Sequence, residues 1–203
     1  MKARTAADRS KLSKSENNHG RIRKYPAFCF MNRAWILVGM MGAGKSSLGR
    51  ALSQLAERPF YDTDTLLQNR LGRTISQIFQ TYGEPTFRDH ESSILRDLEA
   101  SEMVLATGGG IVLRDENWDE MRRLGKTCYL RVAPAVLIQR LEKSRKKRPL
   151  LETEDWEGKL QSMLCARECF YERADVIFDV PNEDLEPVAQ RLFEIMIRPD
   201  RTV

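Results

Sequence analysis

The chain has 203 residues and a mass of 23.4 kDa, which suits a single domain with a substantial hydrophobic core. Its formal net charge of +4 is uneven, because residues 1–33 hold nine Lys and Arg residues against two acidic ones and the remainder is mildly acidic. No apolar run approaches the length that spans a bilayer, so we expect no membrane protein.

Residues 1–30 form a basic N-terminal extension, which we expect to be disordered because it has few large apolar residues and no helical or alternating period. It lacks the apolar stretch of a signal peptide. A solvated tail is favoured over an organellar address or an arm that binds nucleic acid or anionic lipid. Met31, just before the first expected strand, is an alternative start.

The most informative stretch is residues 35–49, where a buried strand at 35–38 runs into Gly39-Met40-Met41-Gly42-Ala43-Gly44-Lys45-Ser46. This fits the G-x-x-x-x-G-K-[ST] phosphate loop without a mismatch. Its backbone N–H groups can cradle phosphate oxygens, Lys45 adds a positive charge, and the Ser46 hydroxyl can bind Mg²⁺. An amphipathic helix follows, with its N-terminus toward the phosphates. This context disfavours the alternative, a glycine turn with a chance lysine.

Strands and helices alternate along the rest of the chain. A short strand at 59–61 precedes Asp62-Thr63-Asp64, and helices are expected at 64–71, 74–83 and 84–99, with Thr74 as a cap and Pro85 in a first turn. Further strands are expected at 103–106, 127–132 and 175–180, and further helices at 115–124 (capped by Asp115), 135–143, 156–171 and 185–196. Five apolar strands alternating with helices indicate an α/β fold, with a parallel sheet covered on both faces.

In such sheets ligands gather at the carboxyl ends of the strands. If the chain stays extended after residue 61, Asp62 and Asp64 share one face and their carboxylates point at the same Mg²⁺ and acceptor hydroxyl. The alternative is an aspartate-rich turn or helix cap. Residues 108–110 are all glycine, so their backbone N–H groups can approach a small ligand closely, unless they form only a wide turn.

Two arginines on expected helices, Arg88 and Arg167, are candidates for binding a small anionic acceptor, because a guanidinium binds a carboxylate through two parallel hydrogen bonds. Surface ion pairs are the alternative. Residues 144–158 are charged and contain Pro149, which suits a mobile lid over an anionic ligand or, alternatively, a solvated loop.

The four cysteines contain no C-x-x-C pair. Cys165 and Cys169 lie four apart on an expected helix, but no third metal ligand is nearby. We therefore expect reduced thiols in a cytoplasmic protein and no metal site built from nitrogen or sulfur.

Six motifs in order resemble those of shikimate kinase over about residues 33–196: Gly39 to Ser46, Asp62-Thr63-Asp64, Gly83-Glu84-Pro85-Thr86-Phe87-Arg88, Gly108-Gly109-Gly110, Arg148-Pro149-Leu150-Leu151, and Arg167 ahead of Tyr171. The resemblance implies a P-loop kinase domain at about residues 31–198. It further implies a five-stranded parallel sheet of order 2-3-1-4-5, helices on both faces and the lid. The implied reaction is transfer of the ATP γ-phosphoryl group to the 3-hydroxyl of shikimate.

The resemblance also implies a role for each site residue. Lys45 and Arg148 would contact the transferring phosphoryl group, with Gly42, Ala43, Gly44, Ser46 and Ser47 also binding ATP. Ser46 and Asp62 would hold Mg²⁺. Asp64 would take the hydroxyl proton, and Arg88, Arg167, Gly109 and Gly110 would bind the substrate. Arg140 and Arg145 both compete for the place of the arginine that stacks on adenine.

Two rival functions stay open from the residues alone. One is a kinase of another specificity, for gluconate or a nucleoside monophosphate, although the glycine triplet and the Gly-Glu-x-x-Phe-Arg segment do not suggest a second base pocket. The other is a phosphate-loop switch docked to nucleic acid by the basic extension. We expect shikimate and ATP as partners, no nucleic acid, and a monomer.

Overall fold

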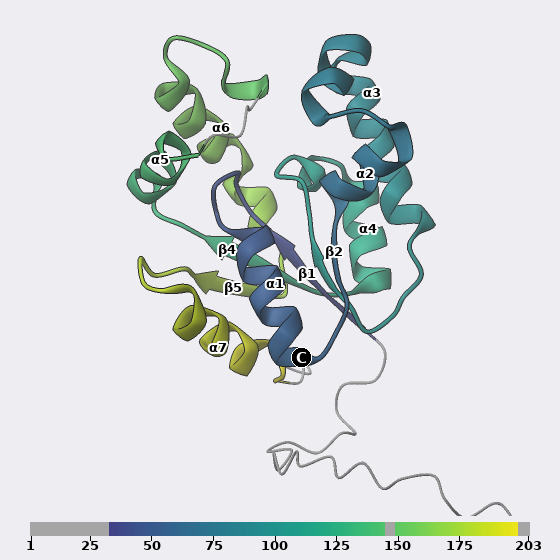
Figure 1. Ribbon diagram of the computed structural model, residues 1–203, viewed down its shortest axis with the longest axis vertical. Helices are drawn as coiled ribbons and strands as arrows, with labels where there is room; N and C mark the ends of the chain where they lie inside the picture. Colours follow the sequence, from purple (N-terminus) through teal and green to yellow (C-terminus); the bar gives the residue numbers. More distant parts are fainter. Residues whose placement is uncertain (1–32, 145–148, 199–203) are drawn as a thin grey trace, which may run out of the picture.

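The computed structural model describes residues 33–144 and 149–198. Five parallel strands form one sheet in the order β2-β3-β1-β4-β5 (Figure 1). They are β1 (Ala34–Val38), β2 (Phe60–Asp62), β3 (Val104–Ala106), β4 (Gly125–Arg131) and β5 (Val176–Asp179). In register, Ile36 of β1 lies beside Leu105 of β3 and Thr127 of β4. The expected fold class and strand order are confirmed.

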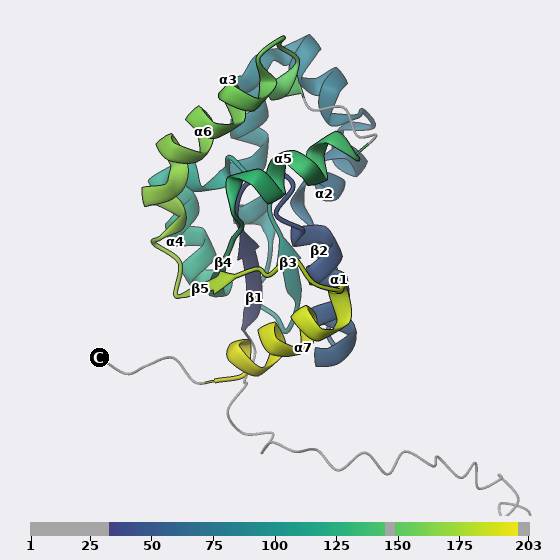
Figure 2. The ribbon, with the colours of Figure 1, turned by 90° about the vertical axis from the view of Figure 1, so that its left-hand side faces the viewer.

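Helices cover both faces of this sheet. Their bounds are α1 (Lys45–Ala56), α2 (Thr63–Leu71), α3 (Ile75–Asp97), α4 (Asp115–Leu124), α5 (Pro134–Glu142), α6 (Trp156–Tyr171) and α7 (Leu185–Met196). Figure 2 shows the sheet between α1 and α7 on one side and α4 and α6 on the other. Single 3-10 turns lie at Ile111–Leu113 and Pro149–Leu151. None of the described helices is long and apolar enough to cross a membrane.

The central strand β1 is buried at every position because both of its faces are packed. Trp35 and Leu37 belong to a core shared with α1 and α7. Ala34, Ile36 and Val38 belong to the opposite core, which includes residues of α3 and α4. Alternate side chains of a strand point to opposite faces, so one apolar run supplies both cores and anchors the phosphate loop that follows it.

Helix α3 is kinked where the sequence predicts a break. Gly83 has φ 77° and ψ 171°, a conformation that glycine adopts readily, and Pro85 follows in the first turn of the second segment. Thr74 and Gln77 form the capping box at the start of the first segment. The second segment buries Phe87, Arg88 and Glu91, so the kink brings charged side chains toward the end of the sheet.

Some sequence expectations need correction. Asp115 is the first residue of α4 rather than its cap, because Arg114 occupies the N-cap position without a side-chain hydrogen bond. The expected extension at residues 1–30 lies outside the described residues. So do Arg145 and Arg148, which belong to the expected lid at 144–158.

Candidate active site

The phosphate loop joins the carboxyl end of β1 to the N-terminus of α1. Gly39, Gly42 and Gly44 have φ values of 144°, 83° and 92°, which side-chain-bearing residues rarely adopt. A Cβ on Gly39 would also lie 2.9 Å from the Leu130 carbonyl oxygen. The first turn of α1 therefore opens into a cavity of about 400 Å³, where its N–H groups and dipole favour an anion.

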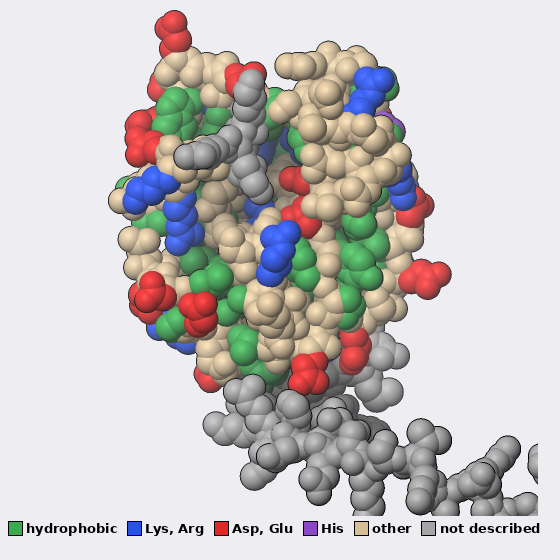
Figure 3. Space-filling model, in the orientation of Figure 1, with side chains coloured by type: hydrophobic (Ala, Val, Ile, Leu, Met, Phe, Trp, Pro, Cys, Tyr) green, Lys and Arg blue, Asp and Glu red, His purple; other side chains and the backbone are tan. Residues whose placement is uncertain are grey.

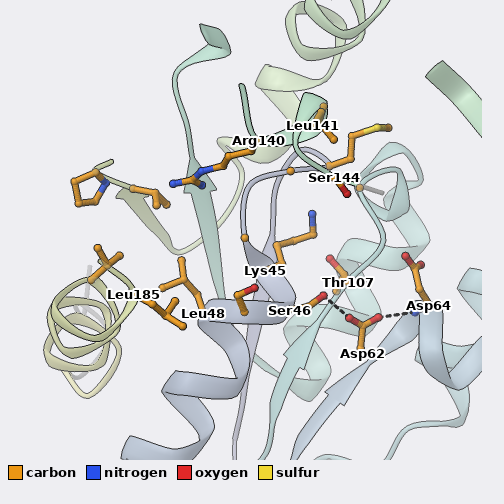
Figure 4. A pocket seen from close by; sticks show the side chains of 18 of the residues that line it. Lys45, Ser46, Leu48, Asp62, Asp64, Thr107, Arg140, Leu141, Ser144 and Leu185 are labelled. Atoms are coloured by element: carbon orange, nitrogen blue, oxygen red, sulfur yellow. Dashed lines mark hydrogen bonds between the residues drawn. The ribbon is translucent and has the colours of Figure 1, made fainter. Parts of the chain in front are cut away.

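Lys45, the first residue of α1, is the buried cation of this loop. Its Nζ donates hydrogen bonds to the carbonyl oxygens of Gly39 at 2.7 Å and Met40 at 2.9 Å. The ammonium group is thereby held beside the loop and on the cavity wall (Figure 4). This placement gives a phosphate in the cavity a positive charge at short range.

Ser46 and Asp62 meet across the cavity floor. Ser46 Oγ donates a 2.6 Å hydrogen bond to Asp62 Oδ2, and Asp62 Oδ1 accepts from the backbone N–H groups of Asp64 at 3.0 Å and Thr65 at 3.4 Å (Figure 4). A hydroxyl and a carboxylate at the mouth of a phosphate loop are the oxygen ligands that Mg²⁺ prefers. The donor set therefore fits the magnesium site expected from the sequence.

The two aspartates do not share a strand face, as the extended-chain argument supposed. Helix α2 begins at Thr63, so Asp62 caps the helix and Asp64 lies in its first turn. The helix-cap alternative is thus confirmed in geometry, yet both carboxylates still line the cavity. The two carboxylates are close together because the N-cap residue and the first turn of a helix lie within a few residues of each other.

The cavity is elongated, and Asp64 lies at the opposite end from Arg140 and Leu185 in Figure 4. Arg140 Nη1 is 3.5 Å from the Ala43 carbonyl oxygen. Of the two arginines expected to compete for the place beside adenine, Arg140 lies on the cavity wall, and Arg145 lies outside the described residues. Figure 3 shows the hollow between the α2–α3 side and the α5–α6 side, with acidic and basic side chains inside it.

The glycine triplet lies against charged side chains. A Cβ on Gly108 would be 2.2 Å from Glu91 Oε1 and 3.0 Å from Asp64 Oδ1, and one on Gly110 would be 2.2 Å from Arg88 Nη1. Because these glycines have no side chains, the charged groups of Glu91, Asp64 and Arg88 can pack directly against their backbone. The sequence analysis did not predict this role of the glycines. The Gly108 N–H is itself used internally, donating to Thr63 Oγ1 at 2.9 Å.

Arg88 is buried between two carboxylates of its own helix. It donates to Glu91 at 2.5 Å and to the partly exposed Glu84 at 2.7 Å. Burial raises the pKa of Glu91 to about 7, against the opposing effect of Arg88, and nearby Asp64 raises it further. Glu91 Oε1 and the Nη1 of buried Arg167 have no hydrogen-bond partner among the described residues. Each of these two atoms is therefore available to a polar ligand.

The expected site residues divide into those that line the cavity and those that do not. On the cavity wall are Gly42, Gly44, Lys45, Ser46, Ser47, Asp62, Asp64 and Gly109. Ala43 is fully buried behind it, whereas Arg88, Gly110 and Arg167 lie outside its lining. Arg167 is near enough to Glu91 and Tyr171 to lower the pKa of each. Sequence reasoning assigned no role to either of these two, although Glu91 follows Arg88 by one helical turn and Tyr171 follows Arg167 by another.

The described residues contain no cluster of three or more His, Cys, Asp or Glu side chains, so Ser46 and Asp62 are the side chains that fit Mg²⁺. Cys165 and Cys169 are exposed and Cys128 is buried, and all three are free thiols.

Comparison with known proteins places this site in context. A family model described as shikimate kinase matches residues 41–197. A shikimate kinase of Synechococcus sp. (strain JA-3-3Ab) is 44% identical over 148 residues, 72% of this chain and 78% of that protein. One of Legionella pneumophila (strain Corby) is 41% identical over 164 residues, 79% of this chain and 92% of the relative. The structure of an Acinetobacter baumannii shikimate kinase in complex with shikimate superposes with a TM-score of 0.78 and 33% identity, covering 82% of this chain and 94% of that one.

Proposed function

The chain belongs to the shikimate kinase family, and we propose that its cavity beside Lys45 holds ATP while the cluster beyond Asp64 holds shikimate. Its reaction is transfer of the ATP γ-phosphoryl group to the 3-hydroxyl of shikimate. One observation carries the assignment of sites: Asp64 borders both regions. It lines the cavity with Lys45 and Ser46, and its Oδ1 lies against Gly108 beside Glu91.

On the nucleotide side, the proposed contacts follow the electrostatics of the phosphate loop. The N-terminus of α1 and residues 42–47 would bind the phosphates, and Lys45 would move its ammonium from the Gly39 and Met40 carbonyls toward the transferring group. Ser46 and Asp62 would hold Mg²⁺, which supplies charge neutralisation for the phosphates. Because the transition state is loose, positioning and charge do most of the work.

At the opposite end of the cavity, Arg140 is the proposed partner of the adenine ring. A guanidinium can stack on an aromatic plane, and Arg140 is held near the Ala43 carbonyl among apolar residues such as Leu185 and Val188. We therefore propose Arg140, and not Arg145, as the arginine that stacks on adenine.

On the acceptor side, Arg88 and Arg167 supply two buried cations for the substrate carboxylate. The N–H groups of Gly109 and Gly110 are proposed donors to ring oxygens, since no side chain blocks their approach. Asp64 would accept a hydrogen bond from the reacting hydroxyl and take its proton as the bond to phosphorus forms. It need not be a strong base, because the proton can leave late in such a transition state.

Arg148 completes the proposal from a segment outside the described residues. Its side chain would approach the transferring phosphoryl group when residues 144–158 close as a lid, and closure would exclude water that otherwise wastes ATP. We propose a monomer acting in the cytoplasm. The three described cysteines are free thiols, which supports a reducing compartment.

The decisive experiment is a coupled assay of ADP formation with shikimate, gluconate or AMP as acceptor. Saturable, shikimate-dependent turnover and production of shikimate 3-phosphate are expected, with little ADP formed from the other two. Turnover with gluconate or AMP instead would assign a different kinase specificity. ATP hydrolysis that is indifferent to every acceptor would favour the phosphate-loop switch.

A further inference from the structure

Tyr171 is a fully buried residue that links the last turn of α6 to the glycine triplet. Its hydroxyl donates a 2.6 Å hydrogen bond to the Gly109 carbonyl oxygen. Its ring stacks on Tyr129 of β4 with centroids 5.0 Å apart and planes 17° from parallel. Because the stack fixes the ring, the hydroxyl is held in one place against the glycines.

This hydroxyl remains a donor over the whole range of pH at which a kinase works. Burial raises the pKa of Tyr171 to about 12, with nearby Arg167 acting in the opposite direction. A protonated phenol has one O–H to donate. Two acceptors lie near it, the Gly109 carbonyl oxygen at 2.6 Å and Met40 Sδ at 3.7 Å, and the carbonyl is the closer and stronger acceptor. The bond is therefore a constant feature of the folded enzyme rather than a titrating one.

The bond fixes the orientation of a whole peptide unit. The described residues contain no cis peptide, so the C=O of Gly109 and the N–H of Gly110 point in opposite directions across one planar group. With the carbonyl directed at Tyr171, the Gly110 N–H must point away from it. Gly110 itself packs directly against Arg88.

A peptide between two glycines is unusually free to rotate, since neither neighbour has a Cβ to oppose the change. Rotation by half a turn would present the negative Gly109 carbonyl in place of the Gly110 N–H. The phosphate loop already confines Gly109 on another side, where a Cβ would be 3.4 Å from the Gly39 carbonyl oxygen and from the Met41 nitrogen. The hydroxyl of Tyr171 is the contact that selects one of the two orientations.

We propose that Tyr171 is a positioning residue for the acceptor, holding the Gly109–Gly110 peptide so that the Gly110 N–H is presented to the substrate beside Arg88. The inference rests on the acceptor side of the proposed function. It ties substrate recognition to α6, which also carries Arg167 one turn earlier. Tyr171 touches no reacting atom: it acts through the Gly109–Gly110 peptide, and its side chain also interacts with Arg167.

The test is Tyr171→Phe, with Tyr129→Phe as the matched control, because the latter removes a phenol from the same stack without touching Gly109. Tyr171→Phe is expected to raise KM for shikimate roughly fivefold, the factor that one neutral hydrogen bond contributes, with kcat and KM for ATP within about twofold. The control should change none of the three. Replacing Tyr171 by 4-aminophenylalanine retains an N–H donor and should restore KM for shikimate.

A second measurement needs no turnover. The chain has twelve glycines, so a protein labelled with ¹⁵N-glycine gives a small amide spectrum in which Gly110→Ala identifies the Gly110 signal. Tyr171→Phe should shift or broaden the Gly109 and Gly110 signals, and Tyr129→Phe should leave them in place. Unchanged glycine signals together with an unchanged KM for shikimate would overturn the proposal, as would equal effects of the two variants. Failure of the wild type to phosphorylate shikimate would instead reject the proposed function, while the spectrum still decides whether Tyr171 fixes the peptide.

Discussion

Arg88 and Glu91 form a buried ion pair one helical turn apart on α3, with Arg88 Nη1 2.5 Å from Glu91 Oε2. Both side chains lie beneath the glycine triplet, Glu91 against Gly108 and Arg88 against Gly110. Within residues 33–144 and 149–198, the other carboxylate oxygen of Glu91 has no hydrogen-bond partner. A buried anion that is only half satisfied is costly to keep charged, so the pair places a titrating group directly beside the proposed acceptor site.

This pair predicts a pH dependence of stability. The pKa of Glu91 is about 7 in the folded protein and near the ordinary 4.5 when unfolded, so the folded state binds more protons between these values. The stability of the wild type relative to Glu91→Gln should therefore fall as pH rises from about 4.5 to 7. Thermal denaturation of both proteins at a series of pH values measures this difference.

Glu84→Gln is the control for that series, because Glu84 is the partly exposed partner of the same arginine. Its replacement should lower stability less than a change at Glu91, because the Glu84 carboxylate is partly hydrated and Arg88 keeps its buried partner Glu91. If the stability of the wild type relative to Glu91→Gln instead rose between pH 4.5 and 7, the pKa of Glu91 would be lowered on folding. That result would contradict a pKa raised by burial.

Asp64→Asn should lower kcat by roughly 10²-fold or more, the usual effect of removing a proton acceptor. The fold should persist, because the cap of α2 uses the backbone N–H of residue 64, which asparagine retains. Steady-state kinetics and ATP binding by calorimetry test both statements, with the exposed Asp119→Asn on α4 as control. Near-normal turnover would remove Asp64 from its proposed role.

Lys45→Met should reduce kcat by roughly 10²-fold to 10³-fold, since a preorganised charge at the transferring group is lost. The variant also leaves the Gly39 and Met40 carbonyls without this donor, so its melting temperature must be measured alongside. A rise in KM for ATP with unchanged kcat would identify Lys45 as a ground-state contact only.

Gly110→Ala should raise KM for shikimate, because the added Cβ would lie 2.2 Å from Arg88 Nη1 and the guanidinium would have to move. Gly72→Ala is the matched control. Gly72 ends α2 at φ 63° with nothing within 4 Å of an added Cβ, so alanine there should lower stability by about 1 kcal/mol without changing kinetics. Equal KM values for the two variants would argue that Arg88 does not bind the acceptor.

The fold was largely predictable because its signals are local. The apolar runs of β1 and β3, the phosphate-loop glycines and the kink at Gly83 each follow from a few adjacent residues. The error at Asp62 and Asp64 has an equally local origin. A D-x-D sequence suits an extended strand and a helix cap alike, and only the actual start of α2 at Thr63 separates the two.

The site was predictable in its residue types but less so in its contacts. Lys45, Ser46 and Asp64 line one cavity as expected. Glu91 and Tyr171 were not predicted because their contacts are with residues distant in the sequence. Glu91 packs against Gly108, and Tyr171 donates a hydrogen bond to Gly109. The spacing of residues within one helix does not predict which distant backbone segment will pack against that helix.

The sequence by itself determined the order of elements, the parallel sheet and the chemistry of the phosphate loop, because hydrophobic period and glycine placement act over a few residues. The tertiary structure alone decided which charges are buried together. It placed Glu91 and Arg88 under the glycines and directed the hydroxyl of Tyr171 to Gly109, 62 residues away. These contacts arise from packing α3 and α6 against the ends of the strands, where burial, and not residue type, sets the strength of each charge and hydrogen bond.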